Sequence, residues 1–245
     1  RRRLRVPSRS MGSPPPVRLI GTPIGNLGDI TFRAVECIRG ADIVACEDTR
    51  RSQRLLSHLD VRDKKLVALH DHNEKGKSER LVERVMEGEK LVYLSDAGMP
   101  TVSDPGYRLV NACLERNLRV EVIPGPSAVT TALAGSGLPS DSFYFGGFLP
   151  VKSGKRTSEL NAALERKETS IYFESPHRIA KTLLLLAESD PGREICIARE
   201  LTKKFETFHR GTAGDLADEF SGISVKGEIT LLVRGAVRNP KTAAS

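Results

Sequence analysis

The residues of this chain that could do chemistry gather in five short loops, each of which follows an apolar run. The loops that begin at 21, 95 and 124 read GTPIGNLGD, SDAGMP and PGPS, and they are rich in Gly and Pro. The loops that begin at 47 and 71 read EDTRR and DHNE, and they carry carboxylates, an imidazole and arginines. Glycine lets main chain approach a bound molecule closely, and carboxylates and imidazoles accept protons or hydrogen bonds. The pattern therefore predicts a ligand site assembled from several loops.

The loop that begins at Ser95 is the most informative of the five. Its Ser-Asp-Ala-Gly-Met-Pro start follows the apolar run 90–94, and a second Asp-Pro-Gly precedes the next helix. A turn from strand to helix usually takes two to six residues, and this one takes about nine. The extra length indicates a loop that holds main chain close to a ligand.

Each of the other loops also has a simpler explanation. The glycines from Gly21 onward are spaced G-x3-G-x2-G, which differs from the dinucleotide fingerprint and equally suits ordinary turns. The Glu47-Asp48 pair could cap the helix that follows it, and the arginines at 50, 51 and 54 could form that helix's solvated face. The HDH run at 70–72 lacks a third ligand at metal-binding spacing, so no metal site is predicted.

Composition limits the class of protein. The chain has 245 residues, 39% of them apolar, which is enough for one large core or two small ones. No apolar run reaches the roughly 18 residues of a membrane span. The net charge is +7, but residues 1–10 hold five Arg and no acid, which leaves 33 basic against 31 acidic residues and little bulk evidence for nucleic acid. The four cysteines show no CxxC spacing, which predicts free thiols in a reducing, cytoplasmic setting.

Apolar runs and helical patterns alternate in the first half. Strands are predicted at 17–20, 42–46, 65–70, 90–94 and 119–123, with helices at 31–39, 49–59 and 77–87. A fourth helix is expected to start with Asp104 as N-cap and Pro105 at its first helical position. Five such strand–helix units predict an α/β domain with a mostly parallel five-stranded sheet flanked by helices.

The second half alternates less regularly and predicts a mixed α/β domain. Its expected strands are 143–148, 170–173, 194–198, 205–210 and 228–233, and its expected helices are 127–134, 156–167, 177–188 and 213–220. The PGP at 124–126 marks a domain junction. The predicted organisation is a disordered, basic, Pro-rich extension at 1–16, an N-terminal α/β domain at 17–124, a C-terminal α/β domain at 125–235 and a tail at 236–245.

Six motifs occur in order between about residues 17 and 234: GTPIGNLGDITFRA, CEDTRRS, HDHNE, SDAGMPTVSDPG, PGPSAVTTAL and YFESPHR. Together they resemble the bacterial 16S ribosomal RNA (cytidine-2′-O-)-methyltransferases of the tetrapyrrole methylase superfamily. The resemblance implies an S-adenosyl-L-methionine (AdoMet) donor and two α/β domains with a ligand cleft between them. It also implies a homodimer and, as the substrate, a cytidine ribose in 16S rRNA of the small ribosomal subunit.

The resemblance also implies which residues bind AdoMet. The strand-end loop reads Asp-Ala-Gly-Met-Pro where small-molecule members usually carry Gly-Asp-Pro, which suits the ribosomal branch but leaves the individual contacts open. The implied residues are Pro23, Asp96, Ala97, Gly98, Met99, Thr101, Val102, Ser103, Ser127 and Ala128 from the first five loops, and Phe173, Glu174, Ser175, Ala198, Arg199, Glu200 and Glu228 from the second domain.

A ribose 2′-hydroxyl is a poor nucleophile while protonated, so a base or a hydrogen-bond acceptor is expected beside it. Asp48 is the first candidate, with Glu47, His72 and Glu174 as alternatives, although all four could instead hold loops and caps. Arg50, Arg51 and Arg178 are expected to meet RNA phosphates. Lys152, Lys155 and Arg156 form another basic segment, which is either an RNA contact or a flexible solvated linker.

Three other functions compete with this interpretation. A tetrapyrrole small-molecule methylase needs a large apolar cleft, which the 5% aromatic content and the absence of Trp disfavour. A non-catalytic RNA-binding scaffold leaves the five polar or glycine-rich strand ends unexplained. A nicotinamide oxidoreductase conflicts with the glycine spacing of the first loop.

Overall fold

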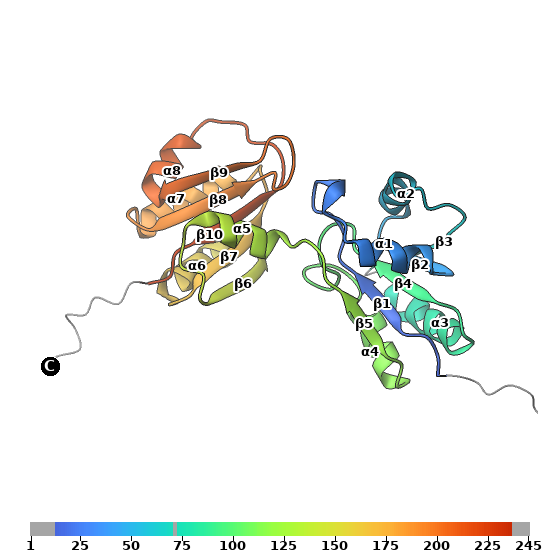
Figure 1. Cartoon of the computed structure of the whole chain (residues 1–245). Coiled ribbons are helices and arrows are strands. Elements are labelled where there is room, and N and C mark those ends of the chain that lie inside the picture. The colour runs from blue at the N-terminus through green and yellow to red at the C-terminus, as the bar shows by residue number, and fades with distance from the viewer. Residues whose placement is uncertain (1–12, 71–72, 237–245) are drawn as a thin grey trace, which may run out of the picture. The chain divides into compact units, whose positions relative to one another are not determined.

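The computed structural model describes residues 13–70 and 73–236, which divide into two compact units (Figure 1). The first unit holds residues 13–23 and 27–125, and the second holds 24–26 and 126–236. Each unit contains one five-stranded sheet, which confirms the predicted pair of α/β sheets. No helix in the described ranges is both long and apolar enough to cross a bilayer.

The first sheet is parallel throughout, with strand order β3-β2-β4-β1-β5. Its three central strands are buried almost completely, because helices cover both faces and leave no side for water. The strands are β1 (Val17–Ile20), β2 (Ile43–Cys46), β3 (Lys65–Ala68), β4 (Leu91–Leu94) and β5 (Val120–Ile123), and the helices are η1 (Leu27–Asp29), α1 (Phe32–Arg39), α2 (Thr49–His58), α3 (Glu74–Met86) and α4 (Tyr107–Glu115).

Alternate side chains of the first sheet contact opposite helix pairs. Ile20, Val92 and Leu94 pack with residues of α1 and α2, whereas Leu19 and Tyr93 pack with residues of α3 and α4. The chain after β1 and β2 therefore leaves toward one face, and the chain after β4 leaves toward the other. In open α/β sheets such a divergence opens a crevice at the carboxyl ends of the strands, where ligands bind. In this sheet the divergence falls around β4.

The predicted start of the fourth helix was wrong. Helix α4 begins at Tyr107, its N-cap is Gly106 with φ of 120°, and no side chain of its own caps it. A buried carboxylate of another helix does so instead: Glu74 Oε1 accepts the N–H groups of Gly106, Arg108 and Leu109 at 3.0, 2.9 and 3.3 Å. Asp104 is used elsewhere, since its carboxylate accepts the hydroxyl of Ser95. A cap supplied from a distant segment leaves no local sequence signal.

Because Glu74 satisfies three main-chain donors of another helix, we expect Glu74→Ala to lower the free energy of unfolding by about 2 kcal/mol. Urea unfolding followed by circular dichroism measures this change. Glu79→Ala is the matched control, because Glu79 lies exposed on the same helix. Equal stability of the two variants would contradict the capping role.

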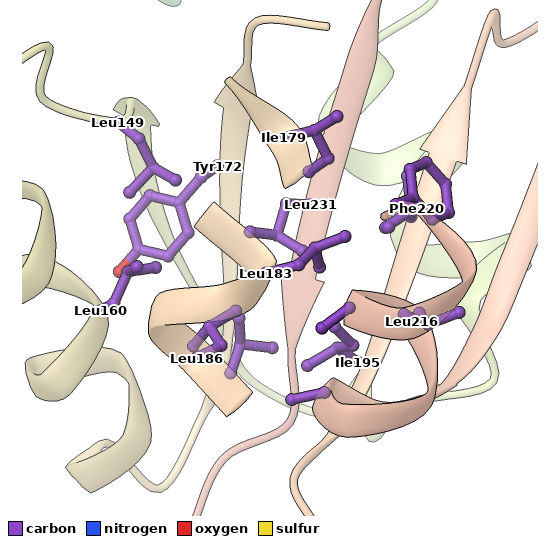
Figure 2. Packing of buried hydrophobic residues seen from close by; sticks show 14 of the residues in the cluster. Leu149, Leu160, Tyr172, Ile179, Leu183, Leu186, Ile195, Leu216, Phe220 and Leu231 are labelled. Carbon is purple, nitrogen blue, oxygen red and sulfur yellow. The ribbon is translucent and has the colours of Figure 1, made fainter. Parts of the chain in front are cut away.

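The second sheet is mixed, with strand order β6-β7-β10-β8-β9, in which only the β6–β7 pair is parallel. Residues of α6, α7 and α8 fill the core on one face (Figure 2), and α5 covers the other. The strands are β6 (Phe143–Phe148), β7 (Thr169–Glu174), β8 (Glu194–Arg199), β9 (Thr207–Thr212) and β10 (Ile229–Val233), and the helices are α5 (Ala128–Ser136), α6 (Ser153–Glu165), α7 (Ile179–Ser189) and α8 (Ala213–Glu219). Helix α6 starts three residues before the predicted position 156, so Lys155 and Arg156 lie in its first turns.

Three residues of the first loop belong to the second unit. Ile24 packs in the core cluster that contains Val129 and Leu201, and the Asn26 N–H donates to Thr202 Oγ1 at 3.1 Å. A Cβ atom on Gly25 would lie 2.5 Å from Lys203 Cγ. The glycine of this motif is therefore explained by a close approach to the 201–203 turn.

Candidate active site

A cavity of about 500 Å³ lies at the carboxyl ends of β2, β3 and β4 in the first unit. Its volume is within the roughly 300–1,000 Å³ of small-molecule sites. Three carboxylates and one guanidinium dominate its lining, so its formal charge is negative. The lining residues are Glu47, Asp48, Thr49, Arg51, Ala68, His70 and Asp96.

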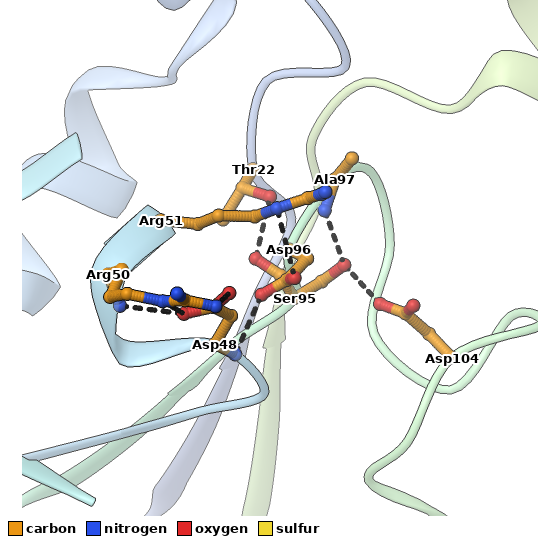
Figure 3. Close-up of polar contacts among 8 residues, drawn as sticks. All are labelled: Thr22, Asp48, Arg50, Arg51, Ser95, Asp96, Ala97 and Asp104. Carbon is orange, nitrogen blue, oxygen red and sulfur yellow. Dashed lines mark hydrogen bonds and ion pairs between the residues drawn. The ribbon is translucent and has the colours of Figure 1, made fainter. Parts of the chain in front are cut away.

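Asp96 connects two of the predicted loops (Figure 3). Its Oδ1 accepts the N–H of Asp48 at 3.0 Å, and its Oδ2 lies 3.6 Å from Arg51 Nε. The Asp96 side chain is only 15% exposed, so this carboxylate is held with one oxygen on main chain and the other near a cation. Asp96 thereby fixes the start of α2 against the end of β4.

Asp48 is the N-cap of α2, which is the simpler of the two roles that the sequence left open. Its Oδ1 accepts the N–H of Arg50 at 2.8 Å, and the Arg50 guanidinium donates to both carboxylate oxygens. These hydrogen bonds from Arg50 hold the pKa of Asp48 below its usual range. A carboxylate with a lowered pKa is a weaker proton acceptor, although it still accepts hydrogen bonds well.

The loop from Ser95 to Gly106 is fastened to the loop after β1. Thr22 and Gly98 exchange two main-chain hydrogen bonds of 2.9 and 3.1 Å, and Thr22 Oγ1 donates to the Ser95 carbonyl at 3.0 Å. Thr101 and Ser103 adopt φ values of 72° and 56°, which cost energy for residues with a Cβ. Strained backbone of this kind is frequent at ligand sites.

Other residues predicted to bind AdoMet lie in the first unit and at the start of the second, and each is described within its own unit. Ala97 N–H donates to Ser95 Oγ at 3.1 Å, and Gly125 N–H lies 3.3 Å from the Met99 sulfur. Val102 is exposed, and Pro23 is half-buried. In the second unit, Ser127 is the N-cap of α5 and Ala128 its first residue, and both are half-buried.

Glu174 and Arg178 form an internal group in the second unit. The Glu174 side chain is fully buried, and its oxygens accept the Ser175 N–H at 2.6 Å and the Thr182 hydroxyl at 2.7 Å. Arg178 Nη2 lies 2.6 Å from Glu174 Oε1. Phe173, the preceding residue of β7, is half-buried and packs in the cluster that α5 covers. These contacts give Glu174 a structural role at the end of β7.

A second polar group lies where β8 ends and β10 begins. Lys203 Nζ lies 2.9 Å from Glu200 Oε1 and 3.0 Å from Glu228 Oε2, and Glu200 Oε1 also accepts the Glu228 N–H at 2.9 Å. Hydrogen bonds from Lys203 and Glu228 lower the pKa of Glu200. Arg199 Nε donates to the Lys226 carbonyl at 2.6 Å, and Ala198 is buried.

One of the candidate bases predicted from sequence lies outside the described residues. In addition, the prediction did not include one histidine that lines the cavity. His72 belongs to the undescribed pair 71–72. His70 lines the cavity, and its Nε2 lies 2.7 Å from Asn73 Nδ2. His70 was not among the acceptors predicted from sequence: it was placed at the end of a strand predicted over 65–70, which stops at Ala68 in the structure.

Comparison with solved structures shows the class of fold to which this chain belongs. The chain aligns over 89% of its length with diphthine synthase (TM-score 0.68, 17% identity, 89% of that chain). It aligns over 90% with the methyltransferase CobJ (TM-score 0.67, 18% identity, 94% of that chain). At these identities the likeness shows a shared two-sheet α/β fold.

Sequence comparisons identify the family to which the chain belongs. The model of the tetrapyrrole (corrin/porphyrin) methylases matches residues 16–217, and this chain belongs to that family. It is 47% identical over 230 residues to a Mesorhizobium japonicum protein named ribosomal RNA small subunit methyltransferase I, covering 93% of this chain and 77% of that one. The Vibrio cholerae protein of the same name is 46% identical over 227 residues, with 90% and 77% covered. Proteins of this family take their methyl group from AdoMet.

Proposed function

We propose that this chain is an AdoMet-dependent methyltransferase that methylates the ribose 2′-hydroxyl of a cytidine in 16S rRNA of the small ribosomal subunit. The observation that most strongly supports this proposal is the acidic cavity at the carboxyl ends of β2–β4, in a chain 47% identical to a protein named as a small-subunit rRNA methyltransferase. We further propose that it works as a homodimer in the cytoplasm, where bacterial small subunits are assembled.

The cavity suits AdoMet by size and by charge. Bound AdoMet supplies an electrophilic methyl group on a sulfonium, and its ammonium, sulfonium and carboxylate give it a net positive charge. The carboxylates of Glu47, Asp48 and Asp96 outnumber the single guanidinium of Arg51 on the cavity wall. Such a wall favours a cationic ligand at short range. The AdoMet contacts expected from Pro23, from the 97–103 loop and from the second unit are part of the same proposal.

Methyl transfer needs an acceptor hydroxyl held in line with the methyl carbon and the sulfur, so positioning carries much of the rate. Asp48 faces the cavity with a lowered pKa, which favours a hydrogen bond from the 2′-hydroxyl over full removal of its proton. His70, on the same wall, offers the side-chain type most often used as a general base. Glu174 is the weaker candidate, because its carboxylate is buried and already accepts internal donors.

Two measurements test the proposal. Calorimetric titration with AdoMet is expected to show one tight site per chain. Incubation with labelled AdoMet and small subunits from cells that lack the enzyme is expected to label one cytidine, at the ribose. Absence of AdoMet binding, or methylation of a tetrapyrrole with no labelling of subunits, would overturn it.

Arg50 is the cation best placed to meet RNA, since its side chain is 88% exposed beside the cavity. Arg51 is less suited to a clean test, because it contacts Asp96. We expect Arg50→Gln to weaken subunit methylation about tenfold, because a phosphate contact is lost. AdoMet affinity is expected to stay within about twofold, because Asp48 still accepts the main-chain N–H of residue 50 and keeps its place at the start of α2. Steady-state methylation and calorimetry measure the two effects.

Arg62→Gln is a matched control for this prediction. Arg62 is 82% exposed and pairs with Asp60 two residues before it, as Arg50 pairs with Asp48. Equal methylation by the two variants would remove Arg50 from the RNA interface.

A further inference from the structure

The segment from Phe148 to Arg156 in the second unit carries a buried cation. Arg156 is 6% exposed, and its Nη1 lies 3.5 Å from the carbonyls of Pro150 and Val151, which directly precede α6. Its buried Nε has no partner, and Arg156 forms no ion pair with any residue that the structure describes. A buried guanidinium without an anion is costly, so an anion bound beside it would repay part of that cost.

Contacts with the interior of the second unit hold this segment in place, so it is not a flexible linker. Leu149 is buried in the core of the second unit (Figure 2). Arg178 donates to the carbonyls of Leu149 and Pro150 at 3.3 and 3.4 Å, while Glu174 anchors its guanidinium. Arg156 approaches the Pro150 carbonyl as well, so two guanidiniums fix the turn that leads into α6.

The outer side of the segment is cationic and presents main-chain donors. Lys152 and Lys155 are exposed, and residues 148–156 carry three positive charges and no carboxylate. Helix α6 is 13 residues long, and its N-cap Lys152 makes no side-chain capping bond. The free N–H groups of a first helical turn bind anions such as phosphate.

An exposed aromatic side chain lies at the end of the edge strand β6, four residues before Lys152 in the chain. Phe148 is 65% exposed and packs edge-on against Phe173 with ring centroids 5.3 Å apart, so its ring is held in place. Exposed aromatic rings near basic side chains commonly stack on the unpaired bases of single strands.

We propose that this segment, which we call the α6 anchor (148–156), binds one stretch of single-stranded RNA. Lys152, Lys155 and the first turn of α6 hold a phosphate over the buried Arg156, and Phe148 stacks on an adjacent base. That the strand is rRNA rests on the proposed function.

The test compares Lys152→Ala/Lys155→Ala with Lys167→Ala/Lys181→Ala, whose lysines are exposed elsewhere on the same unit. Binding of transcribed 16S rRNA is measured by filter retention from 50 to 200 mM salt. Because the anchor pair holds one phosphate of a single strand, its loss is expected to lower the salt slope by about 0.7 and the affinity by about tenfold. Phe148→Ala is expected to lose roughly tenfold in affinity with an unchanged slope.

Equal slopes and affinities for the anchor and control pairs would overturn the anchor. Methylation by the unmodified chain is measured in parallel, so that the two proposals fail separately. If that chain labels no small subunit while the anchor pair still weakens RNA binding, the proposed function fails and the anchor stands. If the subunit is labelled and both lysine pairs bind alike, the anchor fails alone.

Discussion

Replacing Asp96 with alanine is expected to lower small-subunit methylation by about 100-fold and to weaken AdoMet binding at least tenfold. Asp96 is the carboxylate through which the loop after β4 holds the N–H of Asp48 and lies beside Arg51. Without it, the start of α2 is free to shift at the cavity wall, and a displacement of about 1 Å at a reacting group costs about 10²-fold. Calorimetry and a steady-state methylation assay separate the two losses.

Asp96→Asn separates the effect of losing the hydrogen bond to Asp48 from the effect of losing the negative charge. An amide oxygen still accepts the Asp48 N–H, so α2 keeps its position, but the negative charge opposite AdoMet is lost. We therefore expect Asp96→Asn to weaken AdoMet binding as alanine does and to retain more of the rate once AdoMet saturates. Glu36→Ala, which removes an exposed carboxylate from α1, is the control. Full AdoMet affinity in Asp96→Ala would contradict the placement of AdoMet in this cavity.

The strands of both sheets could be predicted because their signal is local. Runs such as VRLI and LVYL are buried on both faces of a parallel sheet, and this burial demands continuous apolar sequence. The carboxyl-end loops followed from the same strands, since parallel order places their ends together. Asp48 was selected from its place at a strand end and Asp96 from the family resemblance, but the hydrogen bond between them was not predicted.

The features that could not be predicted depend on contacts between residues that are far apart in the sequence. Asp104 has the sequence pattern of an N-cap, yet the α4 donors are taken by Glu74, 32 residues before Gly106. Arg156 was expected at the start of a helix and lies in a helix that begins at Ser153, so its burial was not visible. The sequence alone did not decide whether residues 152–156 contact a phosphate or form a flexible linker. That decision needed the contacts of Arg156 with two main-chain carbonyls, which only the structure shows.

Glu174→Ala is expected to have the largest effect on stability, lowering the free energy of unfolding of the second unit by about 3–5 kcal/mol. The change removes the anion of a buried pair and leaves Arg178 uncompensated, together with the Ser175 N–H and the Thr182 hydroxyl. Hydrogen exchange of the β7 and β10 amides measures this loss as a fall in protection of at least about 100-fold. Glu188→Ala, on the exposed side of α7, is the control.

The same variant separates the two roles predicted for Glu174. A structural carboxylate predicts lost protection and a lower yield of folded protein, while the folded fraction keeps its methylation rate per bound AdoMet. A catalytic base predicts the opposite: protection equal to that of Glu188→Ala, with methylation reduced by about 10²-fold or more. The full burial of the side chain and its donors on both oxygens favour the first result, because a substrate hydroxyl cannot reach a carboxylate that is not exposed.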